Sequence, residues 1–277
     1  MRRIAELQVG TWIALAAASG GCNGGGPYMQ EERLQNGLVI ILPGIEGESQ
    51  FNRNIRRGLL SSGIDRAMPI HRWGRPVPGV GMLLNQMDVV GNRIAGAVVA
   101  ERVMEYQDEY PGRPVHLIGH SGGGGIAVFA AEALKDDHKV DGLVLLSASI
   151  SSAYDLSKAL SRSRSGLVNF YSEADVGLLV IGTILAGNVD GTHGPAAGAI
   201  GFDRPRPGDR PEKKRAYSKL HEFPVSDAML PGADAHTAAT GTAFVRRHVA
   251  PWVMSTMWPA VSDAAPADAR IAARSAP

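Results

Sequence analysis

The sequence has a single cysteine, Cys22, among its 277 residues, and its net charge is close to zero at +1. One cysteine excludes an internal disulfide framework and any zinc site built from several cysteines. The chain also lacks a His-Glu-x-x-His motif and an EF-hand loop. A net charge near zero supplies no overall field that would attract nucleic acid. We therefore expect no metal, no other cofactor and no nucleic-acid partner.

A glycine-rich stretch in the middle of the chain carries the most informative motif. Residues 115–118 are a short apolar run, Gly119-His120-Ser121-Gly122-Gly123 follows, and the next segment is apolar at helical spacing. This order predicts a strand, a tight turn and a helix, with Ser121 at the apex. Gly-x-Ser-x-Gly in that setting is typical of a nucleophile elbow, in which the residues two positions from the serine must be small. An ordinary glycine-rich turn is the alternative.

Apolar runs alternate with amphipathic segments along most of the chain. Runs such as residues 38–42 contain no polar residue, which is typical of strands covered on both faces. The expected strands are residues 38–42, 68–71, 115–118, 143–146, 167–171 and 220–225, and the expected helices include residues 51–60, 92–110 and 240–249. This pattern predicts an α/β fold with a mostly parallel sheet and helices on both faces. Sites in such sheets lie at the carboxyl ends of the strands.

The first 22 residues have the features of an export signal. Arg2 and Arg3 precede an apolar run of about ten residues, which is too short to span a bilayer but suits a signal peptide. Small residues then precede Cys22, as in the cleavage box of a bacterial lipoprotein, where the cysteine becomes lipidated. A plain secretory signal cleaved near Ala18 and a retained tail are the alternatives. We expect an exported protein, either anchored in the cell envelope through Cys22 or secreted.

The remaining residues are expected to form one folded domain with loose ends. Residues 23–36 begin with Asn-Gly-Gly-Gly-Pro, which predicts a flexible tether. Residues 37–258 hold all the expected strands and helices, and their number suits a single domain. Residues 259–277 are rich in Ala, Asp, Arg and Pro, which predicts a loose C-terminal tail.

The motif at residues 119–123 and the elements around it resemble the α/β-hydrolase superfamily, in particular its serine esterases and lipases. The resemblance implies the α/β-hydrolase fold, with a reduced, mostly parallel sheet of about six strands and helices on both faces. Residues 149–167 leave too little room for the lid domain that many relatives insert, so we expect no large lid. The long segment at residues 176–215 could still fold over the site.

The family's chain order of nucleophile, acid and base guides the search for the partners of the serine. The resemblance places the acid after the second strand beyond the elbow, which assigns it to Asp175, with Glu173 and Asp155 as alternatives. It places the base in the loop before the last helix, which assigns it to His236, with His193 as the rival. Asp175 would also cap the helix expected directly after it, a role that is compatible with catalysis.

The resemblance also implies two backbone N–H donors for an oxyanion hole. Gly122, directly after the nucleophile, supplies one, and Ile45 supplies the other, with its neighbour Glu46 as the alternative. The implied function is cleavage of carboxylic esters, in a small-molecule or lipid substrate, by a Ser-His-Asp triad through an acyl-enzyme. The alternatives are a thioesterase, acyltransferase or peptidase on the same scaffold, or a non-catalytic binding module. A phosphate-binding loop is disfavoured because its Gly-Lys-Ser/Thr ending is absent.

Overall fold

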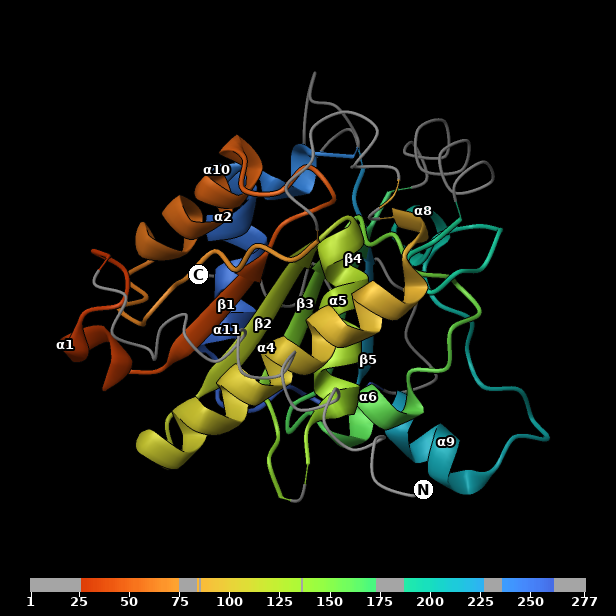
Figure 1. Ribbon diagram of the computed structural model, residues 1–277. Helices are drawn as coiled ribbons and strands as arrows, with labels where there is room; N and C mark the ends of the chain where they lie inside the picture. Colours follow the sequence, from red (N-terminus) through yellow and green to blue (C-terminus); the bar gives the residue numbers. More distant parts are fainter. Residues whose placement is uncertain are drawn as a thin grey trace, which may run out of the picture.

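At the centre of the protein is a sheet of five parallel strands, which lie side by side in chain order (Figure 1). The computed structural model describes residues 26–74, 84, 86–135, 137–172, 187–226 and 236–261. The strands are β1 (Leu38–Leu42), β2 (Val115–His120), β3 (Gly142–Leu146), β4 (Leu167–Tyr171) and β5 (Leu220–Pro224). Their side chains are almost all buried, which explains why the sequence shows continuous apolar runs at these positions.

A short segment at the outer edge of β1 takes the place of the sixth strand that the sequence predicts. Parallel bridges join Ala67 to Leu38 and Ile70 to Ile41, so this segment runs alongside β1. After β1 the chain first runs along one edge of that strand, at residues 67–70, and later pairs with the opposite edge of β1 as β2. This reversal makes the position between the carboxyl ends of β1 and β2 the topological switch point, where α/β sheets usually bind ligands.

Helices cover both faces of the sheet (Figure 1). The helices on one face are α4 (Val89–Glu109), α5 (Gly122–Ala133), α6 (Ser157–Ser161) and α9 (Pro211–Tyr217). Their core includes Leu38, Ile40 and Leu42 of β1. The opposite face carries α2 (Gln50–Leu60) and the C-terminal helices, whose core includes Val39 and Ile41. The predicted α/β fold with helices on both faces is confirmed.

The last helical segment differs from its prediction because it continues past a proline. It runs through η4 (Ala238–Thr240), α10 (Thr242–Phe244), η5 (Val245–Val249) and α11 (Ala250–Met254). The sequence predicts an end before Pro251, because a proline ring and its missing N–H normally break a helix. Here the preceding turn, η5, is a wide π-helical turn, and Pro251 lies in the first turn of α11, where no N–H donor is needed.

The N-terminal part of the described chain is folded onto the domain. Residues Glu31–Leu34 form α1, and Leu34 is only 3% exposed. The Tyr106 hydroxyl of α4 donates to the Leu34 carbonyl oxygen at 2.6 Å, and the guanidinium of Arg56 lies over the Tyr28 ring. The structure therefore differs from the expected tether in the second half of residues 23–36, because these contacts hold that segment against the domain.

The link between β3 and β4 is short. Residues 147–166 are all described and hold one helix, α6, so no large lid is inserted there, as predicted. Another short helix, α8 (Ala197–Ile200), lies against β4. Within the described ranges, no helix is both long enough and apolar enough to cross a membrane. The export segment with Cys22, residues 176–186 and residues 262–277 lie outside the described residues.

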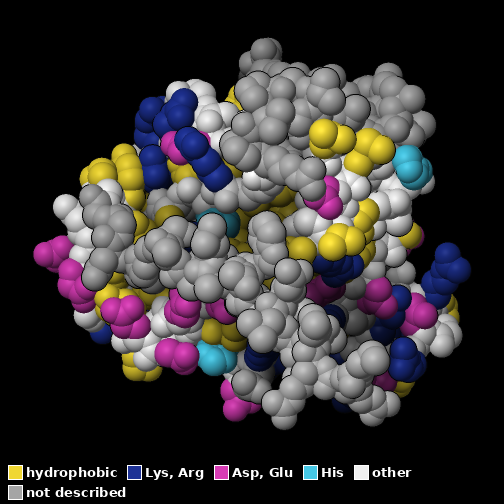
Figure 2. All heavy atoms as spheres, viewed as in Figure 1, with side chains coloured by type: hydrophobic (Ala, Val, Ile, Leu, Met, Phe, Trp, Pro, Cys, Tyr) yellow, Lys and Arg dark blue, Asp and Glu magenta, His cyan; other side chains and the backbone are white. Residues whose placement is uncertain are grey.

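The surface charges are separated although the net charge is near zero. Figure 2 shows Lys and Arg side chains gathered over α2 and the C-terminal helices, where Arg57 and Arg246 are exposed. Acidic side chains gather over α1 and the C-terminal part of α4, where Glu32 and Glu105 are exposed. On this face, basic and acidic side chains therefore gather in different places.

Candidate active site

Ser121 lies in a strained turn between β2 and α5. Its backbone has φ 51° and ψ −125°, and among the described residues only one other non-glycine residue has a positive φ. L side chains rarely adopt this conformation, which costs about 1–3 kcal/mol and persists only where the surroundings enforce it. The Ser121 N–H donates to the Leu146 carbonyl oxygen of β3 at 3.0 Å, and its carbonyl oxygen accepts from the Gly124 N–H at 3.0 Å. The predicted strand–serine–helix turn is confirmed as a local structure.

The glycines two positions from the serine allow the strand and the helix to touch. A Cβ at Gly119 would collide with the backbone of Gly123. A Cβ at Gly123 would collide with the carbonyl oxygens of Leu42 and Pro43 at the end of β1. These contacts are the physical reason why the motif requires glycine on both sides of the serine.

The start of α5 is a run of four glycines, and each lies against a different part of the protein. Gly122 faces Trp73, Gly123 faces the end of β1, Gly124 faces Ala148 and Gly125 faces Val189. A Cβ at any of the four would come within about 3 Å of its neighbour, which is closer than real Cβ atoms usually approach. The helix is therefore packed on all sides from its first residue.

Ser121 stands at the carboxyl end of β2, beside the loop that follows β1. Leu42 pairs with Gly119, so the residues that follow these two strands meet at the same edge of the sheet. A Cβ at Gly44 would lie 3.1 Å from Ser121 Cβ. The serine thus occupies the switch point between β1 and β2, where ligands are expected to bind.

The two residues that the sequence assigns to the oxyanion hole lie beside the serine. Gly122 is the first residue of α5, and the N–H groups of a helix's first turn lack partners within the helix and form the positive end of its dipole. A Cβ at Gly122 would lie 3.2 Å from Cγ2 of Ile45, so the two segments are adjacent. This arrangement can direct N–H groups from both segments at one oxygen beside Ser121.

Trp73, which no sequence motif marks, braces the loop after β1. Its Nε1–H donates to the Pro43 carbonyl oxygen at 2.6 Å, and both groups are buried. The same ring would lie 3.0 Å from a Cβ at Gly122. Trp73 therefore touches both sides of the predicted oxyanion hole. It escapes a motif search because it reaches this loop from 30 residues further along the chain.

His236 reaches the same edge of the sheet through His120. Its carbonyl oxygen lies 3.3 Å from His120 Nε2, and the centroids of the two rings are 5.2 Å apart. His120 directly precedes Ser121, so the contact brings His236 into the neighbourhood of the serine. His236 also leads through η4 into the last helix, which is the place that the resemblance implies for the base.

The predicted acid, Asp175, lies outside the described residues, as does its alternative Glu173. Asp155, the other alternative, is described and is engaged elsewhere. Its carboxylate accepts hydrogen bonds from the N–H and the hydroxyl of Ser157 and pairs with Lys213 Nζ at 3.4 Å. These contacts tie the start of α6 to α9, which gives Asp155 a structural role. The assignment of the acid to Asp175 stays a prediction.

The rival base, His193, lies in an exposed loop that is linked to the serine turn. Its ring lies near Gly187, whose carbonyl oxygen accepts from Gln86 Nε2 at 3.0 Å. Gln86 Nε2 also donates to Ser149 Oγ at 2.6 Å, and the Ser149 N–H donates to the Ser121 carbonyl oxygen at 3.0 Å. Gln86 and Ser149, which no motif marks, therefore support the turn from the side of β3. His193 remains the alternative base.

Glu46 projects from the loop after β1 onto His120. Its Oε1 lies 3.8 Å from His120 Nδ1 and accepts a hydrogen bond from Ser49 Oγ at 3.2 Å. Burial raises the pKa of the Glu46 carboxyl, but the interaction with the nearby imidazole of His120, together with the hydrogen bond from Ser49, outweighs burial and holds that pKa below its ordinary value. Glu46 is therefore a carboxylate at neutral pH, and its contact with His120 accounts for an acidic residue so close to the serine.

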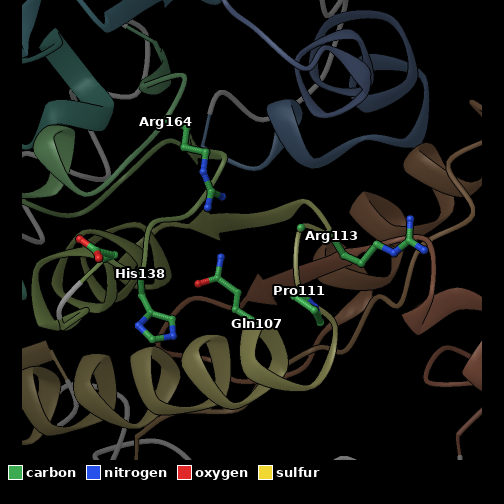
Figure 3. Close-up of a pocket in the computed structure, with 7 residues that line it drawn as sticks. Gln107, Pro111, Arg113, His138 and Arg164 are labelled. Atoms are coloured by element: carbon green, nitrogen blue, oxygen red, sulfur yellow. The ribbon is translucent and has the colours of Figure 1, made fainter.

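A cavity among the described residues lies apart from the serine turn. The cavity, of about 200 Å³, lies at the amino ends of the strands, away from Ser121, and Figure 3 shows Gln107, Pro111, Arg113, His138 and Arg164 around it. Two of its charged side chains have partners, because Arg164 pairs with Asp141 at 3.3 Å and His138 with Asp108 at 3.1 Å. In the same ranges, no group of His, Cys, Asp and Glu side chains is arranged to hold a metal ion.

Comparison with known proteins finds one matching family model and several distantly similar structures. A family model for the alpha/beta hydrolase fold matches residues 93–175, the stretch that contains β2, Ser121 and α5. Among solved structures, esterase PE8 is 16% identical with a TM-score of 0.44, over 76% of this chain and 92% of that chain. The NocB thioesterase domain from the nocardicin cluster is 13% identical with a TM-score of 0.35, over 77% and 94%. Likenesses this distant carry no argument about activity, and no curated protein matches the chain.

The match and the fold support the same superfamily. The matched residues run from α4 through the serine turn and past β4, and they contain the glycines that the turn requires. The parallel sheet places that turn at its switch point. The chain therefore has an α/β-hydrolase-like architecture, and the match over residues 93–175 supports a place in the α/β-hydrolase superfamily.

Proposed function

We propose that this protein is a serine hydrolase that cleaves carboxylic esters through an acyl-enzyme. The observation that carries the proposal is the strained Ser121 at the start of α5, with Ile45 and Gly122 beside it. His236, which contacts the residue before the serine, supplies a candidate base. The match to the α/β-hydrolase family model supports a hydrolase, and the choice of an ester bond is the further step that we propose.

In the proposed reaction, the Ser121 hydroxyl attacks the ester carbonyl carbon while His236 takes its proton. The N–H groups of Gly122 and Ile45 receive the negative oxygen of the tetrahedral intermediate, and such a donor typically contributes about 10²–10³ in rate. The carbon–oxygen bond to the leaving alcohol then breaks, and His236 protonates that alcohol. Water attacks the acyl-serine by the same steps, which releases the carboxylic acid and restores the serine.

We assign to Asp175 the role of holding the imidazole of His236. A carboxylate that accepts from one ring nitrogen leaves the other nitrogen free to take the serine proton, and it stabilises the ring once it is charged. The assignment rests on the family's chain order and on the structural contacts that engage Asp155 elsewhere. Asp175→Asn should therefore reduce kcat far more than Asp155→Asn, about 10⁴-fold if the role is that of the family's acid.

The substrate is proposed to be a small-molecule or lipid ester that enters from the surface. The short link between β3 and β4, with α6 as its helix, supports a site without a large inserted lid. We also propose that the protein is exported and either anchored through lipidated Cys22 or secreted, on the basis of its first 22 residues. Mass spectrometry of the mature N-terminus tests this, and a protein that retains Met1 would contradict it.

A fluorophosphonate probe gives the direct test of the nucleophile. The wild-type protein should be labelled at Ser121, and Ser121→Ala should not be labelled. A panel of p-nitrophenyl esters of increasing chain length, with a thioester included, should then show hydrolysis that is lost in Ser121→Ala. A folded wild-type protein that neither reacts with the probe nor hydrolyses any ester would falsify the proposal.

The base is tested by replacing the two candidate histidines separately. His236→Ala should lose nearly all turnover, by about 10³-fold or more, because serine is a weak nucleophile without its base. His193→Ala should keep most of the activity. Circular dichroism should show that both variants remain folded. If His193→Ala is the inactive variant, the base has been assigned to the wrong histidine.

A further inference from the structure

His120 is fixed on four sides beside the serine. Its side chain is 2% exposed. Its Nε2 lies 3.3 Å from the His236 carbonyl oxygen, and its Nδ1 lies 3.8 Å from Glu46 Oε1. The ring centroid is 5.2 Å from that of His236 and 5.8 Å from that of Phe51. This buried imidazole therefore joins the loop after β1 to the segment that carries the proposed base.

The neighbours of His120 determine the orientation of its ring. A carbonyl oxygen can only accept, so Nε2 must carry the hydrogen that is shared with His236. The Glu46 carboxylate lies on the Nδ1 side, and among the described residues no group is within hydrogen-bond distance of that nitrogen. A flipped ring would turn carbon atoms toward both oxygens, so only the observed orientation turns a nitrogen atom toward each of them.

Glu46 is itself held in place from the start of α2. Its Oε1 accepts from Ser49 Oγ at 3.2 Å, and the Ser49 N–H donates to Asn52 Oδ1 at 2.8 Å. This reciprocal arrangement caps the N-terminus of α2, which is a rigid element packed on the sheet. A continuous series of polar contacts therefore runs from α2 through Ser49, Glu46 and His120 to the backbone of His236.

We infer that Glu46 and His120 form a positioning pair. The pair holds the backbone of His236 in the position from which its imidazole can reach Ser121. The inference rests on the proposed function, because it gives these residues a part in the same reaction. His120 acts on the base through the His236 carbonyl, and Glu46 acts through His120. Neither side chain needs to touch the substrate, so both are positioning residues.

The expected kinetic signature follows from this indirect action. A shift of about 1 Å in a catalytic group can reduce the rate by about 100-fold while substrate binding is retained. Loss of the contact to His236 should therefore lower kcat and leave KM nearly unchanged. A role limited to packing would instead appear as a loss of stability, with a normal kcat in the fraction that remains folded.

The main test compares two substitutions of the same histidine. His120→Met keeps a similar volume but removes the donor, and we expect kcat to fall about 10–100-fold with a KM change below about threefold. His120→Gln keeps an N–H donor of similar reach and should recover most of the lost kcat. His138→Met is the matched control, because His138 pairs with Asp108 away from the serine. It should keep wild-type kcat.

A double-mutant cycle tests whether Glu46 acts through His120. Glu46→Gln removes the charge from a side chain that is partly exposed, so this variant should fold, and kcat should fall about tenfold. The double variant Glu46→Gln, His120→Met should lose no more than His120→Met alone. Independent losses that multiply in the double variant, or a His120→Met enzyme with wild-type kcat, would overturn the inference. If His120→Met does not fold, the same cycle is completed with His120→Leu, which also lacks the donor.

A measurement that needs no activity separates this inference from the proposed function. In ¹⁵N spectra of histidine-labelled protein, Glu46→Gln should move the ring resonances of both His120 and His236, and His138 should not move. Unchanged His236 resonances would contradict the pair even in an active enzyme. Conversely, the His236 ring resonances could move in a protein that the fluorophosphonate probe does not label. That result would support the connection from Glu46 through His120 to His236 and reject the proposed hydrolase.

Discussion

Trp73 and Pro43 are joined by a buried hydrogen bond of 2.6 Å between the indole Nε1–H and the carbonyl oxygen. Trp258 makes a bond of the same kind to the Trp252 carbonyl oxygen at 2.9 Å. The ring of Trp258 lies against Gly142, at the amino end of β3, whereas the ring of Trp73 lies against Gly122, directly after the serine. The two tryptophans therefore make the same kind of hydrogen bond, but only Trp73 lies beside the proposed catalytic centre.

Trp73→Phe should lower both stability and catalysis. Each tryptophan-to-phenylalanine change leaves a buried carbonyl oxygen without its donor, which costs about 1–3 kcal/mol in the free energy of unfolding. In Trp73→Phe the loop after β1 also loses the hydrogen bond that fixes its position. Because oxyanion donors must be accurately placed, kcat/KM should fall about tenfold or more. Urea denaturation and ester hydrolysis measure the two effects. In the control Trp258→Phe, stability should fall and kcat/KM should not; equal kinetic losses would reject a special role for Trp73.

Replacing the serine by glycine should stabilise the protein. Ser121 holds φ 51° and ψ −125°, which glycine adopts without the steric cost that a Cβ brings. We expect Ser121→Gly to raise the free energy of unfolding by about 1 kcal/mol relative to Ser121→Ala, with both variants inactive. The difference between the two inactive variants isolates the backbone strain. Equal urea midpoints would show that the turn is not strained.

Gly123→Ala should damage the site far more than an alanine elsewhere. Its Cβ would collide with the carbonyl oxygens of Leu42 and Pro43, which are backbone atoms that cannot rotate away. We expect a loss of about 3 kcal/mol or more in the free energy of unfolding and no labelling of Ser121. Gly194→Ala is the control, because a Cβ there would meet nothing within 4 Å. Its effect should stay within about 0.5 kcal/mol.

Two buried histidines should make the fold sensitive to mild acid. Burial, with a smaller contribution from the charge of Arg102, lowers the pKa of His71 to about 4. Burial, with a smaller contribution from the charge of Arg66, lowers the pKa of His116 to about 3. Both would titrate near their ordinary pKa, about 6.5, in the unfolded chain. The unfolded state therefore binds more protons below that pH, and stability falls as pH decreases toward 4. Between pH 7 and 5 the two sites together should remove about 4 kcal/mol.

The contribution of each histidine can be isolated by a substitution that does not titrate. His71→Gln keeps an acceptor for Arg102, which donates to His71 Nδ1 at 2.8 Å, and His116→Gln keeps one for Arg66. The urea midpoint of the double variant should change less between pH 7 and 5 than that of the wild type. His138→Gln, at an ion pair on the surface, should follow the wild-type curve. A wild-type midpoint that does not change over this range would show that the two rings are not neutral in the folded state.

The sheet was predictable because its signals are local. Residues 38–42 and 167–171 match β1 and β4 to the residue, since a strand buried on both faces must be a continuous apolar run. The serine turn was predictable because steric contact fixes glycine at positions 119 and 123. In contrast, Pro251 was expected to end the last helix, and the π-helical turn that accommodates it has no signature in the sequence.

The supporting contacts of the site were not predictable because they join distant parts of the chain without a fixed spacing. Trp73 and Gln86 reach the serine turn through contacts to Pro43 and Ser149, and no periodicity relates these positions. The sequence drew attention to Glu46 by its place near the nucleophile, but its partner became apparent only when β1 and β2 were side by side. Sequence spacing predicts the reactive groups, whereas the fold shows which side chains contact the turn and loops around them.

Because of the four glycines at the start of α5, the serine turn should fold only late in the synthesis of the chain. Glycine in a helix is about 1 kcal/mol less favourable than alanine, so these four residues do not hold a helical turn on their own. Their neighbours include Ala148 and Val189, which leave the ribosome after the complete serine motif. A nascent chain that has emerged only as far as β3 thus contains Ser121 but lacks the residues that pack against the start of α5. The proposed ester cleavage should begin only after the second half of the chain has been made and folded.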